Sequence, residues 1–132
     1  MFEKLELTRM TQTMAAQAGA RMGVIARNVA NADTPGYKAM DMPSFAETYA
    51  QADGGMRSTR AGHASADDAR MKPIARRDKS TGAPNGNSVS LEQEMVKAAG
   101  VRQDHEMALA IYRNTSDIIR ASLGRSRSGV GK

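Results

Sequence analysis

The sequence predicts an all-α fold: two long terminal helices packed antiparallel as a coiled coil, with an extended glycine-rich middle segment and one short helix between them. Apolar residues near both ends of the 132-residue chain recur at helical spacing. The middle is rich in glycine, proline and basic residues and lacks that spacing. Aromatic residues make up only 4% of the chain and tryptophan is absent, so helices packed side by side are favoured over a large globular core.

The N-terminal segment, 1–31, is predicted to form one coiled-coil helix. Between residues 3 and 30 the apolar residues follow one another in steps of three and four, which places them in one stripe. The stripe consists of Leu7, Met10, Met14, Ala18, Met22, Ile25 and Val29, and the opposite face carries Thr11, Gln12, Gln17, Arg21 and Arg27. Gly19 and Gly23, four residues apart, indicate either the close approach of another helix or a helix that they merely loosen.

The first helix is predicted to end within residues 28–39. Pro35 disfavours helix at the residue before it, and Pro35-Gly36 is typical of a type II turn in which glycine takes a positive φ. Asn31 and Asp33 have short polar side chains that can cap exposed carbonyl groups or close turns of their own. We therefore expect a specified turn here rather than a frayed helix end.

Residues 32–87 are predicted to hold this turn, a short helix and an extended linker. Pro43 and Ser44 are a helix start signal, and Phe45, Thr48 and Tyr49 form a small apolar face after them. From about residue 51 the chain has too few large apolar residues to offset the entropy of ordering. We expect this linker to be disordered alone and to become ordered on assembly with partners.

A second coiled-coil helix is predicted over 88–124, followed by a basic tail at 125–132. Ser88 or Ser90 can cap it, acidic residues occupy its first turn, and Gly124 is expected to end it. Its apolar positions are Leu91, Met95, Ala98, Val101, Ala108, Leu109, Tyr112, Ile118, Ile119 and Leu123. Paired helices cover one another only partly, so exposed apolar surface predicts assembly with further copies or partners.

The expected helix-packing and assembly interface is drawn from both stripes. It comprises Leu7, Met10, Met14, Met22, Ile25, Val29, Leu91, Met95, Leu109, Tyr112 and Ile119.

No pattern typical of catalysis, metal binding or cofactor binding is found in the sequence. Cysteine is absent, His63 and His105 have no metal-ligand spacing, and Asp67-Asp68 has no acid or base partner. We therefore expect no enzyme activity, no metal site and no cofactor. The net charge of +5 and the basic cluster around Arg76-Arg77 leave one alternative function, a basic, partly disordered nucleic-acid-binding protein. No aromatic residue interleaves that cluster, so a solvated loop is the better interpretation.

Residues 28–39 also carry a resemblance to a known family. Together with Arg21, Ile25-Ala26, Asp41 and Phe45, they resemble the N-terminal signature of the bacterial flagellar rod and hook family. The signature turn in this chain comprises Asn28, Asn31, Asp33, Thr34, Pro35, Gly36 and Tyr37. The segment 86–95 and the short chain are similar to the proximal-rod members of that family.

The resemblance implies a structural subunit of the flagellar proximal rod, the drive shaft of the basal body, which assembles helically and transmits torque from the membrane ring to the distal rod and hook. It implies a periplasmic location and passage through the flagellar type III export apparatus without a cleaved signal, in line with a charged N-terminus and no apolar stretch that could span a membrane. The partners it implies are further copies of the chain, the rod protein FlgC and the adaptor FliE between ring and rod.

Overall fold

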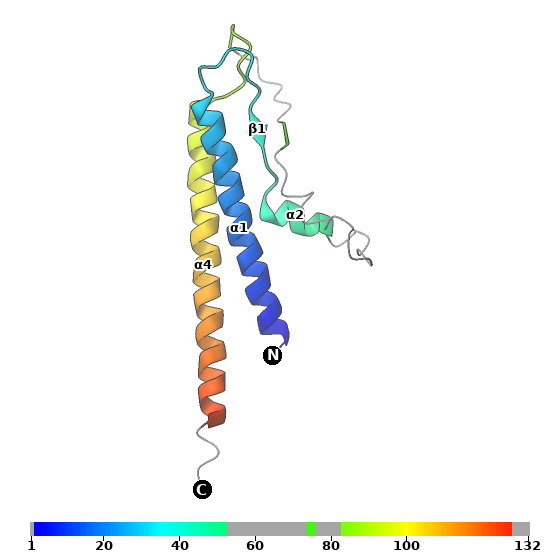
Figure 1. Ribbon diagram of the computed structural model, residues 1–132, viewed down its shortest axis with the longest axis vertical. Coiled ribbons are helices and arrows are strands. Elements are labelled where there is room, and N and C mark those ends of the chain that lie inside the picture. The colour runs from blue at the N-terminus through cyan, green and yellow to red at the C-terminus, as the bar shows by residue number, and fades with distance from the viewer. Residues whose placement is uncertain (1, 53–73, 76–82, 128–132) are drawn as a thin grey trace.

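The computed structural model describes residues 2–52, 74–75 and 83–127. In this part of the chain the order of elements is α1 (Phe2–Ala30), β1 (Met40–Asp41), α2 (Phe45–Ala52), β2 (Ile74–Ala75) and α4 (Leu91–Arg127). The helices α1 and α4 lie side by side in opposite directions, so that both chain ends point away from the connection between the helices (Figure 1). The predicted fold class, two long terminal helices packed antiparallel, is confirmed.

The seam between α1 and α4 has the seven-residue repeat of a coiled coil. Buried residues of α1 recur at Thr11, Ala18 and Ile25, and those of α4 at Glu94, Val101, Ala108 and Thr115. Ala18, Ile25 and Val101 form the apolar centre of the seam, with Met22 and Ala98 packed against it. Most of these side chains are small, which allows the two helix backbones to approach closely.

Two residues assigned to the outer face of the first helix are buried instead. Thr11 is 2% exposed and Gln17 is 1% exposed, whereas the predicted stripe residues Leu7 and Met10 are each 37% exposed. Thr11 can occupy the seam because its hydroxyl group donates to the Thr8 carbonyl within its own helix at 2.8 Å. A polar residue whose hydrogen bond is made within its own helix can therefore be buried in the seam, although the separation of apolar and polar faces predicts that it lies outside.

Both ends of α4 differ from the prediction of 88–124. The helix begins at Leu91, after Ser90, whose carbonyl accepts the first helical hydrogen bond from the Glu94 amide at 3.0 Å. It continues past Gly124, which was expected to end it, to Arg127. A glycine ends a helix by taking the left-handed conformation, and of the described glycines only Gly36 and Gly86 have a positive φ. None of the described helices is long and apolar enough to cross a membrane.

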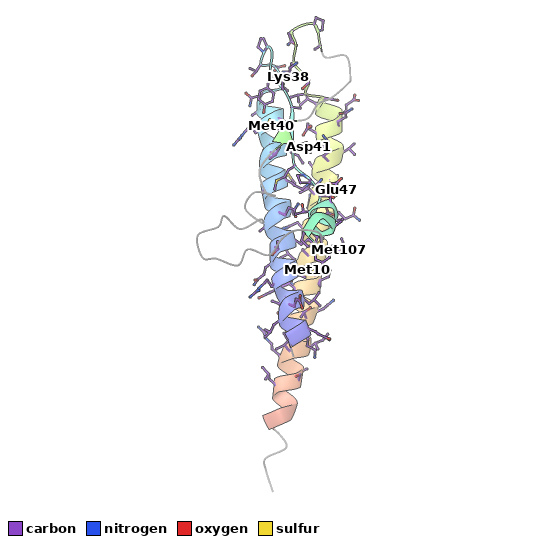
Figure 2. All side chains as sticks on the ribbon, turned by 90° about the vertical axis from the view of Figure 1, so that its right-hand side faces the viewer. Met10, Lys38, Met40, Asp41, Glu47 and Met107 are labelled. Carbon is purple, nitrogen blue, oxygen red and sulfur yellow. The ribbon has the colours of Figure 1, made fainter. Side chains whose placement is uncertain are left out.

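The short helix α2 is started by a capping box and held to α1 by one glutamine. Ser44 and Glu47 bond reciprocally: the Ser44 amide donates to the Glu47 carboxylate at 2.7 Å, and the Glu47 amide donates to the Ser44 hydroxyl at 3.3 Å. The Gln17 side chain donates to the Pro43 carbonyl at 2.8 Å and to the Thr48 hydroxyl at 2.9 Å. These bonds place α2 on the α1 side of the helix pair (Figure 1), and Figure 2 views the pair from that side.

A two-residue antiparallel pairing, which the sequence did not predict, joins β1 to β2, with Met40 opposite Ala75 and Asp41 opposite Ile74. It is the only extended pairing in the described part of the chain. The rest of the predicted linker, 53–73 and 76–82, lies outside the described residues, as do His63, Asp67-Asp68, Arg76-Arg77 and most of the basic tail.

Candidate functional site

The segment where α1 ends and α4 begins contains the turn that the sequence predicted. We call residues 28–40 and 83–94 the helix junction. Within it, Gly36 has φ of 73° and the Tyr37 amide donates to the Thr34 carbonyl at 3.2 Å. These are the features of a type II turn over residues 34–37, with glycine at the position that needs a positive φ. The predicted type II turn is therefore confirmed.

A second glycine turn packs against the first. Gly86 has φ of 78°, and its amide donates to the Ala83 carbonyl at 2.8 Å. A Cβ atom on Gly86 would lie 3.5 Å from the backbone of Gly36, and the Gly36 amide donates to the Asn85 carbonyl at 2.9 Å. The two turns thus hold the chain before α4 against the chain after α1.

Asn87 holds the turn that follows α1. Its side-chain amide lies within 2.8–2.9 Å of three carbonyl oxygens, those of Asn31, Ala32 and Thr34, and its two hydrogens are shared among them. These carbonyl groups come just after Ala30, where α1 ends. Asn87 is 4% exposed, and its own carbonyl oxygen accepts from the Val89 amide at 2.8 Å. One side chain therefore closes the exit of the first helix and shapes the approach to the second.

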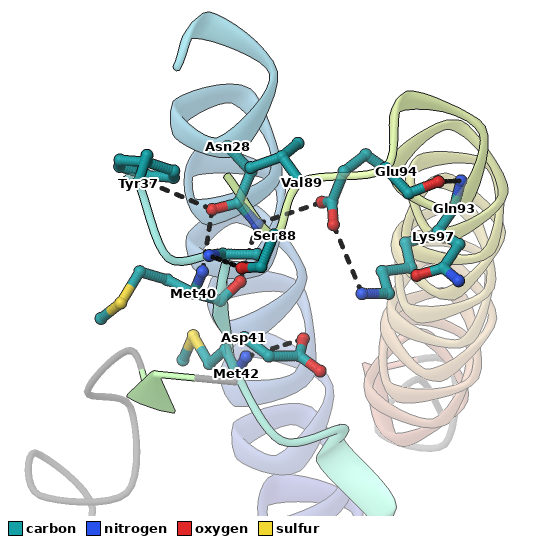
Figure 3. A network of polar contacts seen from close by, with 12 residues as sticks. Asn28, Tyr37, Met40, Asp41, Met42, Ser88, Val89, Gln93, Glu94 and Lys97 are labelled. Atoms are coloured by element: carbon teal, nitrogen blue, oxygen red, sulfur yellow. Dashed lines mark hydrogen bonds and ion pairs between the residues drawn. The ribbon is translucent and has the colours of Figure 1, made fainter. Parts of the chain in front are cut away.

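Asn28 is the central residue of the junction (Figure 3). Its side-chain nitrogen donates to the Met40 carbonyl at 2.7 Å and to the Glu94 carboxylate at 3.2 Å. Its side-chain oxygen accepts from the Met40 amide at 3.0 Å and from the Tyr37 hydroxyl at 3.3 Å. An amide side chain has two donor hydrogens and two acceptor sites, so the Asn28 side chain is saturated. It is fully buried, and it connects α1, the turn, β1 and α4.

Glu94 brings a negative charge into this buried network. Its side chain is 1% exposed, and besides Asn28 it contacts the ammonium group of Lys97 at 3.4 Å. A buried carboxylate is tolerated only where charge and hydrogen bonds compensate the loss of water. The sequence interpretation placed Glu94 at the helix start for its effect on the helix dipole, and the structure adds that it bonds to the other helix.

Ser88 bridges the two halves of the junction beside this network. The Ala39 amide donates to the Ser88 hydroxyl at 2.8 Å, and the Ser88 amide donates to the Tyr37 carbonyl at 3.0 Å. Ala39, in the segment after the turn, is fully buried. The junction is therefore a hydrogen-bonded unit and not a flexible hinge.

The predicted signature turn is gathered in the junction, with unequal roles for its members. Asn28, Thr34, Gly36 and Tyr37 contribute to the type II turn or to the buried network around it. Asn31 caps its own helix by donating to the Arg27 carbonyl at 2.8 Å, as expected. Asp33 and Pro35 are exposed.

The predicted interface residues fall into two groups. Ile25 is buried in the seam, and Met14, Met22 and Ile119 are half-buried. The others are exposed by 37% or more, namely Leu7, Met10, Val29, Leu91, Met95, Leu109 and Tyr112. Their role in assembly stays a prediction.

Sequence reasoning missed three residues that position the elements: Gln17, Asn87 and the interhelical role of Glu94. Each is polar and buried, and each bonds to a segment far away in the chain. One signal was present: Asn87 lies next to the Asn85-Gly86 pair, which is typical of a turn, and polar residues beside such turns often cap neighbouring backbone.

The described residues contain no group of acidic or histidine side chains that could hold a metal ion. His105 is exposed on α4. The two hollows between the helices, of about 230 and 150 Å³, are lined mainly by apolar atoms. Along the described helices, large apolar side chains such as Met95 and Val96 lie exposed on a hairpin that is fixed at its junction.

Comparison with known proteins gave a family match. A family model described as "Flagella basal body rod protein" matches residues 11–38. The matched stretch begins at the buried Thr11 and ends after the turn, so it includes Asn28, Gly36 and Tyr37. No curated protein matches the chain at a significant level. The match gives no support to the nucleic-acid-binding alternative, and the matched family is a structural one.

Proposed function

We propose that the chain, of which residues 11–38 match a family model of flagellar basal body rod proteins, is a subunit of the proximal rod, of the FlgB type. In this role it assembles helically into the drive shaft and transmits torque from the membrane ring towards the distal rod and hook. The proposal rests on one observation above others: a hairpin fixed by buried polar bonds exposes large apolar side chains along both of its helices.

Exposed apolar residues on a rigid pair of helices suit a subunit that carries load. Leu5, Met95 and Val96 are 60%, 74% and 74% exposed, which is costly for a lone chain in water. Burial against neighbours removes that cost and contributes about 25 cal/mol for each Å² of apolar surface covered. A hairpin whose junction is held by buried hydrogen bonds, such as those of Asn28, is suited to transmit force as one unit.

We further propose the partners and location that the family resemblance implies. The chain contacts further copies of itself, FlgC and the adaptor FliE, and it reaches the periplasm through the flagellar export apparatus without a cleaved signal. The exposed residues of the predicted interface, such as Leu7 and Tyr112, would make these contacts.

Deletion of the gene tests the proposed function. We expect a non-motile strain whose isolated basal bodies lack the rod, with motility restored by the wild-type gene. In that strain, Met95→Glu should give poor swimming while the purified variant keeps its helix content, because Met95 is exposed. Arg27→Glu, an exposed change on another face, is the control. A deletion strain that swims normally would contradict the proposal.

Ile25→Asp and Ile119→Asp should also block incorporation into the rod, but for different reasons. Ile25 is 7% exposed in the seam, so an aspartate there disrupts the hairpin itself. Circular dichroism of each purified variant separates loss of the hairpin from loss of a contact between subunits.

A further inference from the structure

The helix pair has a groove along the side of α1 opposite to Gln17. Its two hollows are lined on α1 by Gln12, Ala15, Gly19 and Met22, and on α4 by residues that include Arg102, Leu109 and Tyr112. A Cβ atom built on Gly19 would have no atom within 4 Å apart from those of its chain neighbours and its own helix backbone. Because successive helix residues are turned by about 100°, Gly19 and Gln17 point to nearly opposite sides of α1. The groove therefore lies away from α2.

The outer side of α4, away from the groove, carries an uncharged ridge. Val96, Met107 and Ile118 follow one another at intervals of eleven residues, about three helical turns, and so share one face. They are 74%, 47% and 54% exposed. Gly100, Gln103 and Asn114 lie between them on the same face by helical spacing, and none is charged.

Charged residues form two rows on α4 between the groove and the ridge. An arginine row of Arg102, Arg113 and Arg120 borders the groove, and Arg102 lines it. An acidic row of Glu92, Glu106 and Asp117 lies next, beside the ridge. All six side chains are exposed, and the ion pair of Arg102 with Glu106, at 3.3 Å, joins one row to the other.

From this arrangement we propose that the groove of one copy receives the α4 ridge of a second copy in the same orientation. In a parallel pair, the acidic row beside the inserted ridge faces the arginine row beside the groove. In an antiparallel pair, the acidic row would turn to the α1 side, away from the arginines. Exposed ion pairs add little affinity, so the rows select the orientation while apolar contact supplies the binding.

This contact does not close on itself. Groove and ridge lie on opposite sides of α4, so a bound pair keeps one free groove and one free ridge, and association continues copy by copy. The inference deepens the proposed function and rests on it in one respect: a rod requires subunits that add without closing.

Two substitutions separate the groove from the ridge in the full-length chain. Gly19→Glu fills the groove in space that is open in the single chain, and Val96→Glu places a charge on the ridge at a position that is 74% exposed. Ala20→Glu is the control, because Ala20 is exposed on the same helix and is turned by about 100° from Gly19, away from the groove. Glutamate favours the helix and all three positions are exposed, so these chains should fold.

Sedimentation equilibrium over a concentration series measures the outcome. For the wild type and Ala20→Glu, we expect a mass that keeps rising past the dimer. Gly19→Glu and Val96→Glu alone should each associate at least about tenfold more weakly, because a charged group would have to be buried. Mixed in equal amounts they should form dimers and nothing larger, since one chain keeps its ridge and the other its groove.

Charge reversal tests the orientation. Arg102→Glu with Arg113→Glu should weaken association, and adding Glu106→Arg with Asp117→Arg in the same chain should restore it. The inference is overturned by a wild type that stays monomeric at millimolar concentration, by Val96→Glu associating like the wild type, or by no restoration in the fourfold variant. A deletion strain that swims normally would contradict the rod function and leave these solution results standing.

Discussion

At the junction end of the helix pair, Asn28 and Glu94 are buried and hydrogen-bonded across the helices, whereas at the opposite end Leu5, Ile118 and Leu123 are more than half exposed. The junction uses polar groups to fix one arrangement of its own chain. At the far end α4 extends beyond α1 (Figure 1), and apolar side chains there lie in solvent, as do those of Met95 and Val96 on the outer surface of α4. The difference indicates that folding of the chain is specified by buried polar groups at the junction, and it supports the proposal that contacts to other chains lie on the helix surfaces.

The sharpest way to break the junction is to remove its central amide. Asn28→Ala leaves the Met40 amide and carbonyl, the Tyr37 hydroxyl and the Glu94 carboxylate each short of a partner. We expect a loss of about 2–4 kcal/mol in the free energy of unfolding, measured by urea denaturation followed at 222 nm. Asn31→Ala, which removes one helix-end bond and an exposed bond from the Thr34 hydroxyl, should cost about 0.5–1 kcal/mol. Equal losses in the two variants would show that Asn28 is not central.

Substitutions at one buried and one exposed apolar residue of α1 compare how much the seam and the far end stabilise the chain. Ile25→Ser should destabilise the chain by about 2–4 kcal/mol, because Ile25 is 7% exposed in the seam. Leu5→Ser, at a position 60% exposed, should change the free energy of unfolding by no more than about 0.5 kcal/mol. Thermal denaturation of both proteins under the same conditions measures this. A large loss from Leu5→Ser would mean that the far end also stabilises the single chain.

Glycine-to-alanine substitutions should change the free energy of unfolding in opposite directions at the junction and in the middle of α4. Gly36→Ala forces a side chain into the left-handed conformation and should cost about 1–2 kcal/mol. Gly100→Ala, in the middle of α4 with open space around it, should add about 1 kcal/mol of stability. Chemical denaturation of the two variants decides this. If Gly36→Ala were neutral, the type II turn would not be required for the junction.

The smallest expected effect concerns the start of α2. The Ser44 amide, and then the Ser44 hydroxyl, hydrogen-bond to Glu47 and hold the pKa of its carboxyl group below its ordinary value of 4.5. A lowered pKa means that the ionised group favours the folded chain. The contribution is therefore complete above the ordinary pKa and is lost as the pH falls through the lowered one.

An NMR titration of the Glu47 side chain measures this shift. In Ser44→Ala the hydroxyl bond is lost and the pKa should move back towards its ordinary value, with the amide bond still in place. An unchanged pKa in Ser44→Ala would assign the whole shift to the backbone amide.

Local patterns in the sequence predicted the two long helices, the type II turn and the cap at Asn31. Apolar residues spaced three and four apart define a helix regardless of where its packing partner lies. Pro35-Gly36 determines its own backbone conformation. The burial of Gln17 could not be predicted in this way, because its hydrogen-bond partners, Pro43 and Thr48, lie elsewhere in the chain. Thr11 is satisfied within its own helix, but its burial depends on where α4 packs against α1. Asn87 and Glu94 depend on contacts across more than 50 residues. The prediction that α4 ends at Gly124 was wrong for a related reason, since a glycine does not end a helix unless its neighbours stabilise the left-handed turn.

The turn after α1 has a consequence for the order in which the chain can fold. Asn87 bonds to the carbonyl groups of this turn from 53 to 56 residues further along. While the chain is being synthesised, the N-terminal helix therefore lacks both a fixed turn after it and its packing partner until the second half has left the ribosome. Helices without packing partners are only marginally stable in water. A nascent chain with only residues 1–52 outside the ribosome should give a first helix that is cleaved rapidly by proteases, and a chain with residue 127 also outside should protect it.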